Sequence, residues 1–222
     1  CLRILRIDVE HIGIPSNFVI YDDCYRMQLI KQILKNDLKV QDIKQARPIL
    51  SLISKMKNDG LTQDDLEFNA KTPTERLTAE AWPIYKKRMD ELGALDFDDL
   101  ILKTAELFTN SEEVREAYKS RFKHILVDEY QDTNPIQYKL LKCLTDEKSN
   151  IFVVGDDWQS IYSWRGADYR IILNFEQDFP GAQVIKLEQN YRSTQNILDA
   201  AHKIITKNSS RSAKELFTDE GP

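Results

Sequence analysis

The chain has 222 residues, of which 41% are hydrophobic, so it can bury one large core or two small ones. Its formal net charge of -5 excludes an overall attraction for nucleic acid or an anionic membrane, and any such binding needs a local patch or groove. The cysteines Cys1, Cys24 and Cys143 have neither the spacing of a zinc site nor an evident disulfide framework. Without a signal-peptide pattern or a membrane-spanning apolar run, we expect a cytoplasmic protein with reduced thiols and no membrane association.

The first part of the chain has the periodicity of helices. It opens at Cys1 without a methionine and within a helical pattern, so we expect it to be part of a longer protein. Apolar residues then recur at helical spacing, as Met27, Ile30 and Leu34 do. We predict an all-helical unit over residues 1–93.

The second part, residues 94–207, alternates strands with helices. Three apolar runs rich in β-branched residues are predicted strands, at 124–127, 151–155 and 184–187. Each is followed by a polar loop and an amphipathic helix, which predicts an α/β fold with a parallel sheet whose ligands bind beyond the carboxyl ends of the strands. The polar stretch 208–222 is assigned to a linker or a truncated edge.

The segment DEYQDTN after the first predicted strand holds three carboxylates within five residues. Asn134 can cap the next helix with Pro135 at its first position, and Asp132 can lie near that helix N-terminus. Asp128 and Glu129 need another explanation, because adjacent carboxylates at the end of a buried strand repel each other and lose hydration. This favours a magnesium and nucleotide site over a purely structural role, since Mg²⁺ keeps most of its waters and needs few protein carboxylates.

The segment GDDWQSIYSWRG gathers Trp158, Tyr162 and Trp164 beside Arg165 on an expected loop. Aromatic rings next to an arginine suit the faces of unstacked bases. The alternative, equally favoured by this segment alone, is that the rings pack under the loop as a satellite core. Gln159 could bind a phosphate oxygen or hold the loop in place.

The segment QNYRST places Tyr191 and Arg192 just ahead of a helix capped by Ser193 or Thr194. Arg192 could form a structural bridge to an acidic residue or donate two hydrogen bonds to a phosphate. This motif alone slightly favours the bridge.

Together these segments resemble the superfamily I DNA helicases of the UvrD, Rep and PcrA type. The resemblance covers essentially the whole chain, in the family's order, and is carried by LDFDDLI (95–101), ILVDEYQDTNPIQ (125–137), VVGDDWQSIYSWRGAD (153–168) and LEQNYRST (187–194). It implies the first RecA-like motor domain of a P-loop NTPase, interrupted by an inserted helical subdomain at residues 1–93. It also implies a helicase that couples ATP hydrolysis to 3′–5′ translocation on single-stranded DNA and unwinding at duplex junctions, in DNA repair or replication.

The resemblance implies a role in ATP hydrolysis for five residues. Asp128 would hold Mg²⁺ through water, and Glu129 would orient and deprotonate the attacking water. Gln159 would contact the γ-phosphate or that water. Arg192 would stabilise charge on the transferring phosphoryl group, and Tyr191 would stack on adenine.

By the same resemblance, Tyr162, Trp164 and Arg165 would grip single-stranded DNA. The chain departs from the family at two positions. Trp158 stands where a small or acidic residue is more common, and Ser163 stands where a basic residue is more common. No G-x-x-x-x-G-K-[ST] loop occurs, and the family keeps it upstream and its second motor domain downstream. We therefore expect a monomeric fragment that is inactive alone, with a magnesium-dependent nuclease or a non-catalytic binding module for DNA or protein as the alternatives.

Overall fold

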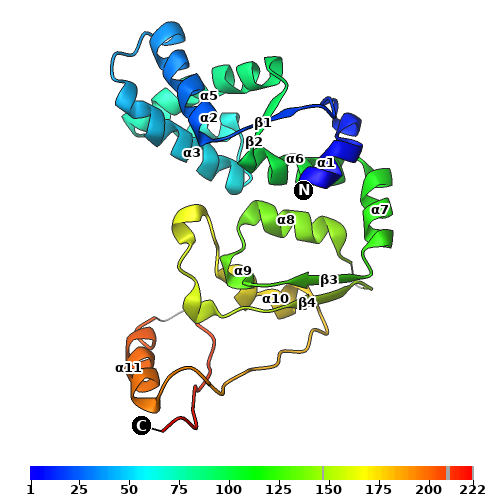
Figure 1. Cartoon of the computed structure of the whole chain (residues 1–222), viewed down its shortest axis with the longest axis vertical. Coiled ribbons are helices and arrows are strands. Elements are labelled where there is room, and N and C mark those ends of the chain that lie inside the picture. The colour runs from blue at the N-terminus through cyan, green and yellow to red at the C-terminus, as the bar shows by residue number, and fades with distance from the viewer. Residues whose placement is uncertain (147, 209–210, 222) are drawn as a thin grey trace. The chain divides into compact units, whose positions relative to one another are not determined.

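The computed structural model describes residues 1–146, 148–208 and 211–221 (Figure 1). The chain forms two compact units. Unit 1 comprises Cys1–Ile125 and Asn134–Ile151, and unit 2 comprises Leu126–Thr133 and Phe152–Pro222. Within the described residues, no helix combines the length and the apolar composition needed to cross a bilayer.

The first part of the chain is mainly helical, but the prediction of an all-helical unit is wrong, because Val19–Tyr21 forms the strand β1. Its elements are α1 (Leu2–Asp8), η1 (Val9–Ile12), β1 (Val19–Tyr21), α2 (Asp23–Gln32), η2 (Ile33–Asp37), η3 (Ile43–Gln45), α3 (Ala46–Asn58), α4 (Gln63–Asn69) and α5 (Pro73–Glu91). The one strand, β1, pairs in parallel with β2 (Ala94–Asp96), with Val19 opposite Ala94. Helices α4 and α5 begin with capping boxes, in which a threonine and an acidic residue bond each other's backbone N–H groups.

Two hydrophobic clusters form the core of unit 1. The first is built from α2 to α5 and includes the buried Ile30, Ile53 and Tyr85. The second packs α1, α6 and α7 together and includes the buried Leu5 and Phe108. The clusters meet at β2, where Ala94 belongs to the first and Leu95 to the second. Both clusters lie in one compact unit, and the domain boundary predicted at residue 93 stays a prediction.

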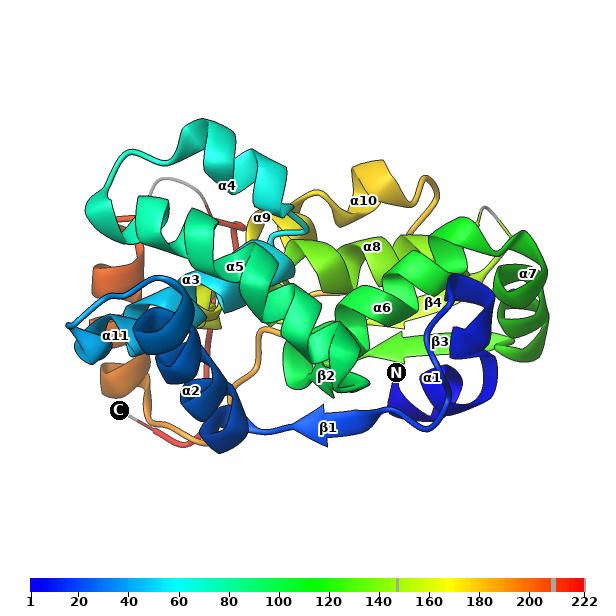
Figure 2. The same ribbon diagram turned by 90° about the horizontal axis from the view of Figure 1, so that it is seen from above.

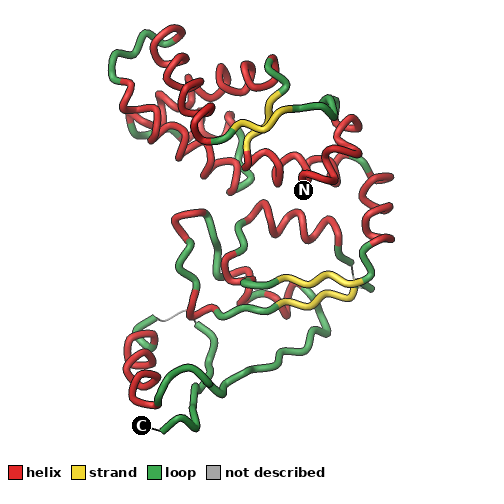
Figure 3. Tube along the Cα trace, viewed as in Figure 1, coloured by secondary structure: helices red, strands yellow, loops and turns green. Residues whose placement is uncertain are grey.

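The second part of the chain has the predicted α/β class. Its elements are α6 (Phe97–Asn110), α7 (Glu112–Arg121), β3 (His124–Val127), η4 (Tyr130–Asp132), α8 (Pro135–Leu144), β4 (Asn150–Val153), η5 (Asp157–Gln159), η6 (Ser163–Arg165), α9 (Arg170–Leu173), α10 (Phe175–Asp178) and α11 (Gln195–Ile205). β3 pairs with β4, and Figure 3 shows both strand pairs in yellow. Helix α8 lies along α6 in both views of the ribbon (Figures 1 and 2).

The predicted strand at 184–187 does not form. Its apolar side chains are largely exposed, at 57% for Val184, 75% for Ile185 and 84% for Leu187. A strand needs a neighbour for its backbone N–H and C=O groups, and none of the described strands lies beside this run. Pairing begins just after it, where Asn190 N donates to Phe217 O at 2.7 Å and Phe217 N donates to Glu188 O at 3.1 Å.

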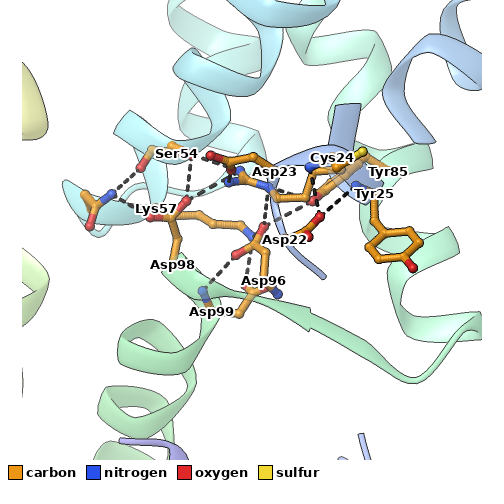
Figure 4. Close-up of polar contacts among 12 residues, drawn as sticks. Asp22, Asp23, Cys24, Tyr25, Ser54, Lys57, Tyr85, Asp96, Asp98 and Asp99 are labelled. Carbon is orange, nitrogen blue, oxygen red and sulfur yellow. Dashed lines mark hydrogen bonds and ion pairs between the residues drawn. The ribbon is translucent and has the colours of Figure 1, made fainter. Parts of the chain in front are cut away.

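A buried ionic network links α2, α3 and α5 to the start of α6 (Figure 4). Lys57 Nζ lies 2.8 Å from both Asp96 Oδ2 and Asp99 Oδ1, and Arg26 Nε lies 3.3 Å from Asp96 Oδ2. The Asp96 side chain is fully buried and also accepts a hydrogen bond from the Tyr85 hydroxyl. Burial favours the neutral acid, but the charges of Lys57 and Arg26 outweigh it and lower the pKa of Asp96 to about 2.

Candidate functional site

The first candidate residues, Asp128 and Glu129, follow β3 directly. Glu129 has a left-handed backbone, with φ 51° and ψ 43°, a conformation that costs a non-glycine residue about 1–2 kcal/mol. Its backbone N–H donates to Asp128 Oδ1 at 2.9 Å, and its Oε2 accepts a hydrogen bond from Gln131 Nε2 at 2.7 Å. At this turn the Asp128 carboxylate accepts from the Glu129 backbone, and the Glu129 carboxylate accepts from the Gln131 side chain.

The expectation that this pair ends a buried strand is wrong. Leu126 in β3 is 73% exposed, and both carboxylates are exposed. β3 pairs with β4 alone among the described strands, so it has no second neighbour to bury it. Lost hydration is therefore no reason for a cation at Asp128 and Glu129, and their role must rest on other observations.

Gln131 is a residue that the sequence pattern did not single out. It is buried, and its amide joins two motifs, because Nε2 donates to Glu129 Oε2 while Oε1 accepts from Asp156 N at 3.0 Å. Gly155 makes this approach possible, since a Cβ there would lie 2.7 Å from Gln131 Oε1. In the sequence, the sign of this linking role was an amide side chain placed among the carboxylates of DEYQD.

The end of the DEYQDTN segment starts a helix, as predicted. Asn134 caps α8 in a capping box with Gln137, and Pro135 occupies the first helical position. Asn134 Nδ2 also donates to Asn58 Oδ1 of α3 at 2.9 Å. Asp132 lies just before this cap, and its buried Oδ1 accepts no hydrogen bond from the described residues. Burial, and then the negative charge of Glu129, raises the pKa of Asp132.

Gln159 ends the turn η5, which Asp156 caps. Asp156 Oδ1 accepts from Trp158 N at 2.9 Å, and Asp156 Oδ2 accepts from Gln159 Nε2 at 2.8 Å. The Gln159 side chain is exposed, and its amide oxygen receives no hydrogen bond from the part of the chain that is described. The amide nitrogen of Gln159 is thus held by Asp156, while its amide oxygen is free to accept a hydrogen bond from a ligand.

The aromatic residues of this loop divide into two kinds. Trp164 is 72% exposed and Tyr162 is 39% exposed, and their ring centroids lie 6.3 Å apart. The Arg165 guanidinium lies 4.6 Å from the Trp164 centroid and 5.5 Å from that of Tyr162. Trp158, in contrast, packs on His202 with a centroid distance of 5.6 Å. The satellite-core alternative therefore describes Trp158, whereas Trp164 presents a ring face to solvent.

Tyr191 and Arg192 are both exposed. The Tyr191 hydroxyl donates to Gln189 Oε1 at 2.7 Å, and the Arg192 backbone N–H donates to Asn190 Oδ1 at 2.9 Å. The Arg192 guanidinium forms no ion pair with an acidic side chain in residues 1–146, 148–208 or 211–221, which disfavours the structural bridge. Among the described residues, no hydrogen bond or ion pair joins Tyr191 or Arg192 to Glu129 or Gln159. Thr194 precedes α11, but its side chain makes no capping hydrogen bond, so the predicted side-chain cap does not form there.

The residues fit a magnesium ion that keeps most of its water. Asp128 offers an exposed carboxylate, and within the described chain its Oδ2 receives no hydrogen bond. No group of three or more His, Cys, Asp and Glu that could hold a metal ion occurs among the described residues. One carboxylate suits Mg²⁺, which commonly binds one or two protein carboxylates together with substrate phosphates.

Comparison with known proteins points to a single family. The family model described as UvrD/REP helicase N-terminal domain matches residues 1–180. Relatives named ATP-dependent DNA helicase PcrA, from Staphylococcus epidermidis and Staphylococcus aureus, are each 45% identical over 218 residues. The match covers 98% of this chain but 30% of each relative, so the chain spans less than a third of the length of these curated relatives.

Proposed function

This chain belongs to the UvrD/REP helicase N-terminal domain family, and from this membership we propose that it is part of an ATP-dependent DNA helicase. The whole protein would couple ATP hydrolysis to 3′–5′ movement on single-stranded DNA and would unwind duplex junctions during repair or replication. A cytoplasmic location follows from the proposed substrate. Residues 1–93 would be the inserted helical subdomain, 94–207 part of the motor domain, and 208–222 its truncated edge or a linker.

One chain of hydrogen bonds carries this proposal. Glu129 Oε2 accepts from Gln131 Nε2, Gln131 Oε1 accepts from Asp156 N, and Asp156 Oδ2 accepts from Gln159 Nε2. Gln159 begins the short loop that ends in the exposed Trp164. The proposed catalytic carboxylate and the proposed base-stacking ring are thereby connected through hydrogen bonds and one short loop, which gives a route for coupling ATP hydrolysis to DNA binding.

The chain's own residues would divide the work of hydrolysis. Bound Mg²⁺ and ATP would supply the transferable phosphoryl group and neutralise its charge. Asp128 would hold the ion, and Glu129, with Oε2 fixed by Gln131, would take a proton from water on its other oxygen. Arg192 would donate to phosphate oxygens, and Tyr191 would offer its exposed ring to adenine.

Taken alone, this chain would not turn over ATP. It has no G-x-x-x-x-G-K-[ST] loop, whose backbone and lysine hold the phosphates in related NTPases. The phosphate-binding lysine would have to come from another part of the whole protein. Tests of activity therefore need the full-length protein.

The proposal is tested by replacing Glu129 with glutamine in the full-length protein. Glu129→Gln keeps an acceptor for Gln131 but removes the base, so the ATP turnover number should fall by a factor of about 10²–10⁴ while nucleotide binding persists. Glu176→Gln, an exposed glutamate of α10, is the matched control and should leave turnover unchanged. Normal turnover in Glu129→Gln would show that another residue is the base.

A further inference from the structure

Residues 211–214 lie against the loop that holds Gln159, although Lys214 follows Asp156 by 58 positions. Lys214 Nζ forms an ion pair with Asp156 Oδ1 and lies 3.6 Å from Asp157 Oδ1. The Lys214 side chain is 13% exposed and that of Asp156 is 30% exposed, so this pair is partly shielded from water. Ser212 adds two bonds to Asp157, from its backbone N–H at 2.7 Å and from its hydroxyl at 2.5 Å.

Trp158 also contacts residues 211–214 from the loop that holds Gln159. Its indole Nε1–H donates to Ser212 O at 3.2 Å. Two cations face its ring, with Lys214 Nζ 4.5 Å and Arg211 Cζ 5.5 Å from the centroid. His202 of α11 packs on the ring as well. Asp156, Asp157 and Trp158 thus all contact residues 211–214. We name the segment 211–214 the tail clamp.

Asp156 connects the tail clamp to the proposed ATP site. Its Oδ1 accepts from Lys214 and from Trp158 N, its Oδ2 accepts from Gln159 Nε2, and its own N–H donates to Gln131. Burial raises the pKa of this half-buried carboxyl, but hydrogen bonds from Lys214 and Gln159 outweigh burial and lower it. Asp156 is therefore ionised at neutral pH, and Lys214 is the cation that compensates it.

We propose that Lys214 is a positioning residue that acts through Asp156 on Gln159, and that the tail clamp holds the nucleotide-contacting end of the loop in place. This role rests on the proposed helicase function. Without Lys214, the neighbouring carboxylates of Asp156 and Asp157 lose their shared cation and repel each other. The turn η5 then loosens, and Gln159 loses the fixed acceptor that orients its amide.

Kinetics of the full-length protein test this role. A misplacement of about 1 Å can cost on the order of 10²-fold in rate, so Lys214→Met should lower kcat of DNA-stimulated ATP hydrolysis by about 10-fold or more, with a smaller change in KM for ATP. Lys214→Arg should restore most of the rate, because it keeps the cation. The exposed Lys203→Met in α11 is the matched control and should match the unaltered protein. A normal kcat for Lys214→Met would overturn the proposal.

A double-mutant cycle tests the route through Asp156. In an Asp156→Asn background, Lys214→Met should cost less than about 2-fold, because the Asp156 charge is already gone and Asp157 no longer has an adjacent carboxylate to repel it. A full 10-fold loss in that background would show that Lys214 acts by another route and would overturn this inference.

Hydrogen exchange separates this inference from the proposed function. Lys214→Met should speed amide exchange of residues 156–165 by at least about 10-fold while leaving α3 unchanged. Unchanged exchange of the loop would overturn the tail clamp even in an active helicase. An unaltered protein without DNA-stimulated turnover would overturn the helicase proposal, and with it the catalytic role of Lys214, whatever the exchange result.

Discussion

Replacing Lys57 by methionine should destabilise the helical part of unit 1. Breaking a buried ion pair from one side costs about 3–5 kcal/mol, because it leaves an uncompensated charge. Lys57 Nζ lies 2.8 Å from Asp96 and Asp99, and its side chain is only 7% exposed. Methionine nearly keeps the volume and removes the charge. Arg26 remains 3.3 Å from Asp96, so we expect the lower part of the range, about 3 kcal/mol.

Hydrogen exchange in the full-length protein measures this loss locally. Each factor of ten in an equilibrium constant corresponds to about 1.4 kcal/mol, so amides of α3 and α5 should exchange about 10²-fold faster in Lys57→Met. Lys55→Met, an exposed lysine of the same helix, is the matched control and should change exchange by less than about 2-fold. Acceleration below about 10-fold would refute the reasoning.

A second variant identifies the cause. Asp99 Oδ2 accepts a hydrogen bond from Asp96 N at 3.1 Å, and an asparagine can still accept it. Lys57→Met combined with Asp99→Asn removes one of the unpaired charges, so it should be more stable than Lys57→Met alone. An additive loss would instead point to lost packing around the lysine stem.

Three further predictions concern pH and DNA binding. The stability contributed by Asp96 is complete above its ordinary pKa of 3.8 and is lost as pH falls through its folded pKa of about 2. In thermal unfolding, the melting temperature of unit 1 should therefore fall between about pH 4 and 2, and it should fall less in Asp96→Asn. Burial lowers the pKa of Lys57, but the carboxylates of Asp99 and Asp96 together outweigh burial and raise this pKa above its ordinary value of 10.5. The stability contributed by Lys57 should therefore be complete below pH 10.5 and be lost as pH rises through the higher folded pKa. Trp164→Ala should weaken single-stranded DNA binding by about 1–3 kcal/mol in fluorescence anisotropy with little change in melting temperature, since the ring is 72% exposed; unchanged affinity would contradict base stacking.

The local features of this protein could be read from its sequence. Most helices of the first 93 residues, the α/β class of the part after them, and Asn134 with Pro135 at the start of α8 agree with the structure. The exceptions are the strand β1 and the absent strand at 184–187. Each of these signals depends on residues within about one helical turn or a few strand positions of one another. The motif segments that carry the family resemblance are likewise contiguous, so they were visible before any fold was known.

Other features were decided only by tertiary structure. Trp158 and Trp164 lie in one loop, and spacing could not say which ring would be packed and which exposed. The run 184–187 has the composition of a strand, yet no described strand lies beside it. Lys214 reaches Asp156 across 58 positions, and Lys57 reaches Asp96 across 39. Contacts of this kind depend on which distant segments the folded chain brings together, and neither local propensity nor hydrophobic periodicity encodes that choice.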